Sequence, residues 1–247
     1  PAPTDPKAKD VIMIPGNQEP VIGIVSDPEA VNSTFEVYWK NEAMPEEFNN
    51  TLLGKISDIL KSLISSIMDE RFSDISAKAD APFIHAGFGI GNLCETMEVS
   101  MGNIAAHEND PVGAFKAFYT EIKKMEKYGF SSDEISRAKE DLLSYYESAA
   151  KKASTRQNSE LVQPLIDNFF DNYAYMEPEQ EYEITKQLMS MLPDQAINQT
   201  VAQIIPDSNM VVVFKGPQKE GYVLPTVEDI RKAIEEVNGA EIKPNES

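Results

Sequence analysis

Histidine and cysteine, which supply most ligands of a catalytic zinc ion, are scarce in this sequence. It has two histidines, His85 and His107, and one cysteine, Cys94. Metal-assisted hydrolysis needs two or three strong ligands close together and a carboxylate that handles the proton of the attacking water. No H-x-x-E-H motif occurs, and HENDP, which starts at His107, has Pro111 where a second histidine would stand. Proline breaks the helix that would bring such ligands together, so we predict no metal ligand in this chain.

Signatures of nucleophilic catalysis and of nucleotide binding are also missing. There is no G-x-S-x-G elbow, and Cys94 falls in an apolar run, where a lone cysteine usually acts as a small hydrophobe. GFGIG (residues 87–91) has glycine at every second position, whereas a dinucleotide loop needs G-x-G-x-x-G at the start of a helix. Alternating glycines in a strand let a bound peptide approach closely; the alternative is a helix packed on the glycines. We predict no catalytic residue.

The overall charge excludes several classes of partner. The 247 residues include 41 acidic and 22 basic side chains, which gives a net charge of −19. Nucleic acids and anionic membrane surfaces attract the opposite sign, so we expect neither as a partner. One cysteine allows no internal disulfide. The longest uncharged run, residues 81–94, is too short to cross a bilayer, so no membrane insertion is expected. The opening PAPTDPKAKD reads as a linker, without a signal peptide.

Hydrophobic periodicity predicts the elements that would position these residues. Apolar runs and period-two alternation predict strands at residues 11–15, 20–25, 34–40, 82–92, 93–105 and 209–217. The strands 82–92 and 93–105 are expected to form a hairpin that turns near Gly91-Asn92. Apolar residues at three- and four-residue steps predict helices at 48–76, 112–128, 131–152, 159–171, 179–191, 194–204 and from Thr226 onward. The order is not a strict alternation, which predicts an α+β fold: a mostly antiparallel sheet with helices packed on one face.

Signals for helix ends cluster around the second and third long helices. Gly129 suits the position just past a helix end, and Ser131 with Glu134 forms a capping box for the next helix. Arg71 lies near the end of the first long helix, where it would stabilise the helix terminus or bind a carboxylate. We therefore assign Arg71 a structural role at this corner.

Three segments, in this order along the chain, resemble the pitrilysin/insulinase family of zinc metallopeptidases. ERFSDISAKADAPFIHAGFG (70–89) is similar to the family's helix-to-strand corner, and GFSSDEISRAKEDLL (129–143) to its acidic cap and long helix. LPDQAINQTVAQIIPDSNMVVVFKGP (192–217) is similar to its closing helix and strand. The resemblance implies a pitrilysin-like domain at 20–217. It leaves 1–19 as a linker or upstream extension, and 218–247 as a closing helix and a linker to a following domain.

The missing motif decides which repeat of the family the chain resembles. One family domain usually carries H-x-x-E-H, homologous domains have lost it, and the halves close around a peptide that adds a strand to a sheet edge. The resemblance thus implies a non-catalytic domain, similar to the second domain of a long bacterial member and inactive alone. It would form the chamber wall, with the catalytic domain of the same polypeptide and a peptide substrate as partners. Zinc would be bound in that catalytic domain, and the location would be periplasmic or exported.

The corner itself departs from the family pattern. Many members place an arginine before the corner and a tyrosine in the strand, and these hold the substrate near the zinc. Here Ser76 or Ala77 stands in the first place and Phe83 in the second, while Arg71 matches an earlier family arginine. Direct catalytic help is therefore not expected. Peptide contact is expected along the strand, at Phe83, His85, Gly87 and Gly89.

Two other functions stay open on the sequence alone. Peptidase-like domains without zinc also serve as stand-alone structural or assembly subunits, as in respiratory complexes. The third possibility is an unrelated acidic ligand-binding domain. An H-x-x-E-H motif upstream in the same reading frame favours the peptidase, and a nearby start codon without that motif favours the assembly subunit. A different topology would favour the third.

Overall fold

The computed structural model describes residues 11–245 and contains, within that range, one five-stranded sheet. Its strands are β1 (Val21–Asp27), β2 (Ser33–Glu42), β3 (Phe83–Cys94), β4 (Met97–Ala106) and β5 (Met210–Pro217). The order across the sheet is β1-β5-β2-β4-β3, so β3 forms one edge. Only the β1–β5 pair is parallel among these described strands. The expected α+β fold with a mostly antiparallel sheet is confirmed.

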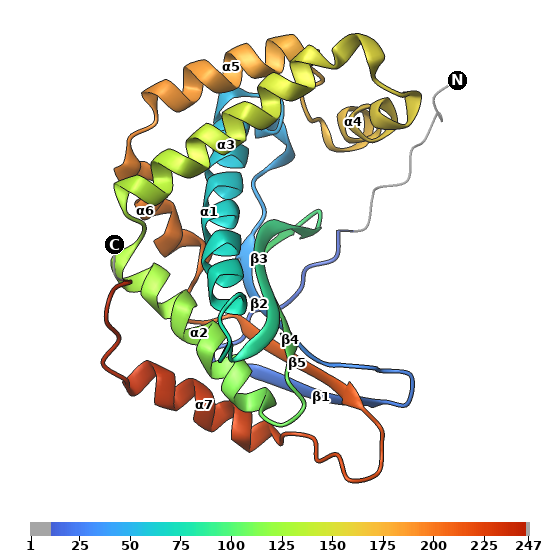
Figure 1. Ribbon diagram of the computed structural model, residues 1–247. Helices are drawn as coiled ribbons and strands as arrows, with labels where there is room; N and C mark the ends of the chain where they lie inside the picture. The colour runs from blue at the N-terminus through green and yellow to red at the C-terminus, as the bar shows by residue number, and fades with distance from the viewer. Residues whose placement is uncertain (1–10, 246–247) are drawn as a thin grey trace, which may run out of the picture.

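Helices cover one face of this sheet (Figure 1). They are α1 (Leu52–Ser76), α2 (Pro111–Tyr128), α3 (Ser132–Lys151), α4 (Asn158–Asp171), α5 (Pro178–Met191), α6 (Asp194–Ile204) and α7 (Val227–Gly239), with short 3-10 turns at Glu46–Phe48 and Ala153–Thr155. α1 packs along β3, and α2 packs between the sheet and α7. α3 and α5 lie side by side and lead to α4, which stands apart from the sheet (Figure 1). No described helix has the length and apolarity that a bilayer crossing needs.

The core explains why these elements meet as they do. On β2, Phe35, Val37 and Trp39 are buried while Glu36 between them is exposed, the alternation of a half-buried strand. Phe118 of α2 packs directly on the backbone of β4 at Gly102, where an added Cβ would lie 2.1 Å from the ring. Buried residues of α7 join the same core, which extends through Ile230, Ala233, Ile234 and Val237.

Two local expectations are wrong. Residues 11–15 form no strand: Val11, Ile12 and Met13 are exposed, because no described strand pairs with them. The hairpin turns at residues 95–96 rather than at Gly91-Asn92, because Gly91 pairs with Val99 and both strands continue to Cys94 and Met97.

The helix-end signals are confirmed. The Ser131–Glu134 capping box forms and Gly129 has a positive φ of 67°. Thr226 is the N-cap of α7, the helix predicted from Thr226 onward. Most of the expected linker at 1–19 lies outside the described residues.

Candidate functional site

The strand expected to contact peptide, β3, pairs with β4 and with no other strand of residues 11–245, so its other side lies at the edge of the described sheet. His85, Gly87 and Gly89 alternate along it and share the outer face, where His85 is exposed. Phe83 faces the opposite way: its side chain is fully buried and meets the ring of Phe72, with centroids 6.1 Å apart. Three of the four residues therefore lie on an accessible surface, and Phe83 would offer a peptide only its backbone.

The glycines of β3 are not packing sites for a helix. An added Cβ at Gly89 or Gly91 would meet no atom within 4 Å, and at Gly87 the nearest atom would be Asp69 Oδ1 at 3.4 Å. The alternative of a helix packed on these glycines is therefore wrong for Gly89 and Gly91, while at Gly87 one side chain of α1 lies at van der Waals distance. The close helix contact occurs at Gly102 in β4, which carries no distinguishing signal in the sequence. The outer face of β3 is consequently smooth and open.

Part of the β3 edge is already occupied by α1. The backbone N–H of Phe88 donates a hydrogen bond to Asp69 Oδ1 at 2.9 Å, so this carboxylate takes a donor that a pairing strand would otherwise use. Further along, Ile90, Gly91 and Asn92 border a cleft of about 530 Å³, which we call the hairpin cleft. It lies between the end of the β3–β4 hairpin, α1 and the C-terminal end of α4.

Acidic side chains dominate the hairpin cleft. Among the described residues that line it, six are carboxylates and one is basic, Lys61; the carboxylates are Glu46, Asp58, Glu95, Glu98, Asp167 and Asp171. Lys61 forms an ion pair with the buried Glu98. The cleft therefore has negative charge that its own cation does not balance.

Two groups at this cleft have raised pKa values, and burial is the main cause of both. Burial raises the pKa of Asp58, and the attraction of Lys61 and Lys55 only partly opposes this. Burial also raises the pKa of Tyr173, as does repulsion from the carboxylates of Asp58 and Asp171. Such a cleft favours a cationic guest. Even so, no three His, Cys, Asp or Glu side chains in the described part of the chain are arranged to hold a metal ion.

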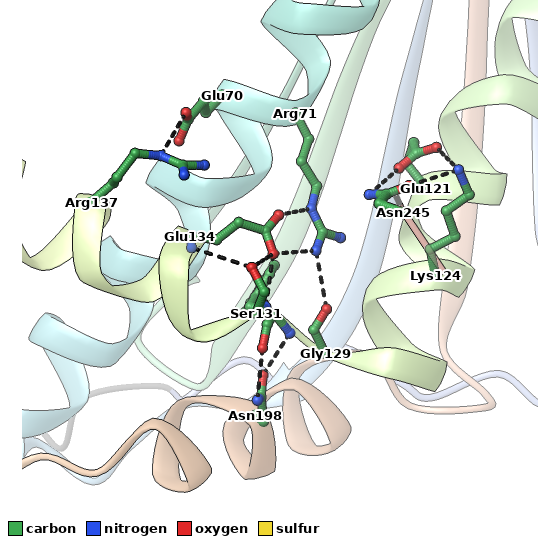
Figure 2. A network of polar contacts seen from close by, with 11 residues as sticks. Glu70, Arg71, Glu121, Lys124, Gly129, Ser131, Glu134, Arg137, Asn198 and Asn245 are labelled. Atoms are coloured by element: carbon green, nitrogen blue, oxygen red, sulfur yellow. Dashed lines mark hydrogen bonds and ion pairs between the residues drawn. The ribbon is translucent and has the colours of Figure 1, made fainter. Parts of the chain in front are cut away.

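Arg71 lies at a different place, where α1 meets the joint between α2 and α3. Figure 2 shows its guanidinium facing the carboxylate of Glu134, with Nε 2.6 Å from Oε1 and Nη2 3.0 Å from Oε2. Nη2 also donates to the backbone carbonyl of Gly129 at 3.1 Å, and the guanidinium stacks over the ring of Phe130. This bidentate pair ties three helices together, which gives Arg71 the carboxylate partner that its position suggested.

Glu134 binds Ser131, the N-cap of α3, as well as Arg71. Its Oε2 accepts hydrogen bonds from the backbone N–H of Ser131 at 2.8 Å and from the Ser131 hydroxyl at 2.9 Å. Burial raises the pKa of Glu134, but the hydrogen bonds from Arg71 and Ser131 outweigh this, and the pKa lies below its ordinary value. Asn198 of α6 holds the neighbouring backbone, exchanging two hydrogen bonds with Phe130 (Figure 2).

A second cleft of about 640 Å³ adjoins this corner, and we call it the corner cleft. The described residues that line it include four bases and four acids: Arg71, Lys78, Lys124, Arg137, Asp74, Glu121, Asp133 and Glu134. Pairs of opposite charge lie along its walls, with Arg137 on Glu70 and Lys124 on Glu121 (Figure 2). Its charges are therefore mostly used within the fold.

Comparison with known proteins identifies the fold. No family model matches the sequence, and no curated protein is similar to it. Solved structures do match. The first half of the periplasmic protease PqqL from Escherichia coli superposes with a TM-score of 0.83 at 15% identity, over 98% of this chain and 52% of that one. A structure described as a predicted insulinase family protease from Yersinia pestis superposes with a TM-score of 0.73 at 13% identity, over 95% of this chain and 49% of that one.

An inactive peptidase domain from Pseudomonas fluorescens also matches, with a TM-score of 0.60 at 16% identity over 86% of this chain and 47% of that one. The chain thus spans about half the length of the solved structures it matches. Identities this low establish the three-dimensional arrangement alone. The chain has the fold of insulinase-type peptidase domains, among them one described as inactive.

Proposed function

We propose that this chain is a non-catalytic domain of a zinc metalloendopeptidase, in which an H-x-x-E-H domain outside this chain carries out proteolysis. The observation that carries the proposal is the shared fold combined with the absence of H-x-x-E-H from the sequence. Its role is to form part of the chamber wall and to pack on the catalytic domain.

Peptide contact along β3 belongs to this proposal. An extended peptide gains affinity from backbone hydrogen bonds at a sheet edge, and side-chain contacts add selectivity. β3 offers an edge, a smooth face at Gly87 and Gly89, and the exposed ring of His85. The hairpin cleft lies at the far end of the same strand.

Zinc belongs to the other domain in this proposal. Within this chain, His85 is on the outer face of β3, His107 follows the end of β4, and Cys94 ends β3 beside Thr96. These three do not fit a zinc site, because they do not converge with carboxylates as zinc ligands must. The periplasmic setting of PqqL supports an exported location for this protein.

The test uses the isolated chain and its reading frame. After dialysis against zinc, the isolated chain is expected to retain far less than one zinc per molecule and to leave fluorogenic peptides intact. Stoichiometric zinc together with peptide cleavage by the isolated chain would contradict the proposal. The reading frame upstream of Pro1 is expected to encode H-x-x-E-H.

A zinc-free structural or assembly subunit is the second candidate. It is favoured by the match to a domain described as inactive, since that fold persists there without activity. A start codon close to Pro1 with no H-x-x-E-H in the frame selects this candidate over the first.

A further inference from the structure

Helix α4 has its apolar side turned away from the protein. Its 14 residues place apolar side chains at three- and four-residue steps. Leu161 is half-buried, and the other five are exposed: Val162, Leu165, Ile166, Phe169 and Phe170. Phe169 is 78% exposed and Phe170 68%. We call this set the α4 stripe. A stripe of this spacing normally faces a core.

The opposite side of α4 is the one that approaches the rest of the fold. Asp167 and Asp171 line the hairpin cleft, and Phe170 reaches it from the border of the stripe. No residue of α4 is buried. The helix is fastened mainly at its C-terminal end, where Asn49 Nδ2 donates to the carbonyl of Asp171 at 2.7 Å. It therefore lies on the domain by its acidic side, with the apolar side uncovered.

A helix of this kind is stable only when its apolar side packs against another surface. A 14-residue helix is marginal in water without packing, and Pro164 in its interior removes a backbone hydrogen bond. Contiguous exposed apolar surface on this scale usually marks an interaction site. The α4 stripe is therefore a candidate surface for binding another protein segment.

Charge selects the occupant. α4 carries Glu160, Asp167 and Asp171 and no basic residue. These carboxylates lie on the side opposite the stripe, so the charge that acts on an occupant is that of the whole chain, −19, which opposes a second copy and an anionic membrane alike. The complementary surface is an apolar groove bordered by lysine or arginine. The matched peptidase structures are about twice the length of this chain, which leaves room for such a groove on an adjoining domain.

We propose that the α4 stripe docks into an apolar, basic-rimmed groove on a neighbouring domain of the same polypeptide. The inference rests on the proposed function, because that function requires a neighbouring domain. It adds the residues that make the contact and the chemistry of the surface that receives them.

Hydrogen exchange of amides 158–171 tests the docking. These amides are expected to exchange at least about tenfold more slowly in the entire product of the reading frame than in this chain alone. The double variant Leu165→Gln/Phe169→Gln in the entire product is expected to restore the fast rate. The control Val31→Gln/Val223→Gln alters two valines outside α4 that are more exposed than Leu165 and Phe169, and it is expected to leave protection intact. Circular dichroism of each variant in the isolated chain verifies folding.

The outcomes separate this inference from the proposed function. Equal exchange rates in the two forms, with H-x-x-E-H present in the frame, overturn the docking and leave the proposed function standing. Protection in a frame that lacks H-x-x-E-H supports the docking and overturns the proposed function. Loss of protection in the control variant overturns the docking. If the wild-type chain forms a dimer and Leu165→Gln/Phe169→Gln dissociates that dimer, the stripe binds a second copy of the chain. This result would also overturn the proposed docking on a neighbouring domain. A frame that encodes no further domain overturns both.

Discussion

The corner cleft and the hairpin cleft are similar in size but use charge in opposite ways. Four bases and four acids line the corner cleft in the described chain, and Arg71 and Glu134 there hold α1, α2 and α3 together. Six carboxylates and one lysine line the hairpin cleft, and burial raises the pKa of one of those carboxylates, Asp58. Balanced charge stabilises a fold, whereas unbalanced charge is a cost that binding can offset. The hairpin cleft is thus the better candidate for a contact outside the domain.

The largest expected effect is at the corner. Arg71→Ala leaves Glu134 partly buried without its cation and should lower the free energy of unfolding by about 3 kcal/mol. The control is Arg137→Ala, whose pair with Glu70 is 54% and 44% exposed, against 11% and 17% for Arg71 and Glu134. That control should cost about 0.5 kcal/mol. Urea unfolding measures both, and equal losses would remove the distinction between the two pairs.

The Arg71 effect should depend on pH. Because the folded-state pKa of Glu134 is lowered, its contribution is complete above the ordinary value of 4.5 and is lost as pH falls toward the folded-state value. The difference in unfolding free energy between wild type and Arg71→Ala should therefore be full at pH 7 and shrink below about pH 4.5. A difference that grows on acidification would contradict this assignment.

Gly129 should be the next most sensitive position. Its φ of 67° and the position of Asn198 Oδ1, 2.5 Å from an added Cβ, oppose any side chain. Gly129→Ala should cost about 2 kcal/mol by urea unfolding. Gly221→Ala is the matched control, since its φ is 80° but no atom lies within 4 Å of the added Cβ. A cost at Gly221 as large as that at Gly129 would show that Asn198 does not matter.

In the hairpin cleft, removal of a charged group should raise the free energy of unfolding rather than lower it. Asp58→Asn removes a charge that burial disfavours, so it should stabilise the protein by about 0.5 kcal/mol at pH 7. Because the pKa of Asp58 is raised in the folded state, the gain should disappear as pH falls through that pKa toward the ordinary value of 3.8. Asp74→Asn in the corner cleft is the control. Destabilisation by Asp58→Asn at pH 7 would indicate that the carboxylate has a partner.

The smallest effect on stability is expected on the β3 face. The Cβ that Gly89→Val adds would meet no atom within 4 Å, so the change in unfolding free energy should be less than about 0.5 kcal/mol. If the complete polypeptide is the peptidase proposed above and the peptide lies on this face, the same substitution should raise KM for a peptide at least about tenfold. An unchanged KM would remove Gly89 from the peptide path.

Local features of the fold were predictable, and long-range ones were not. The capping box at Ser131 and the glycine at 129 follow from residue type at fixed spacing. The turn of the hairpin was misplaced because Gly91-Asn92 suits a turn, yet both residues remain paired in the extended strand. Insertion of β5 between β1 and β2 joins residues nearly two hundred positions apart, for which one sequence has no signal.

The candidate site was predictable only in part. The glycine spacing of β3 and the position of Arg71 are visible in the sequence. The sequence identifies Glu134 as part of a helix cap but does not indicate that it pairs with Arg71. Asp58 of α1 and Asp167 of α4 line the same cleft although more than one hundred residues separate them, and neither residue is distinctive along the chain. Phe83 was expected beside the peptide because it matched a family position. Regular alternation would also place it on the face of His85, but the register shift between Phe83 and His85 turns its side chain into the core.

Peptidase activity of the complete polypeptide tests the central claim most directly. The product of the whole reading frame is expected to cleave a fluorogenic peptide, to lose that activity with a zinc chelator, and to regain it with added zinc. The 247-residue chain alone should show none of this. Zinc-dependent cleavage by the isolated chain, or a complete polypeptide that neither binds zinc nor cleaves peptides, would contradict the account.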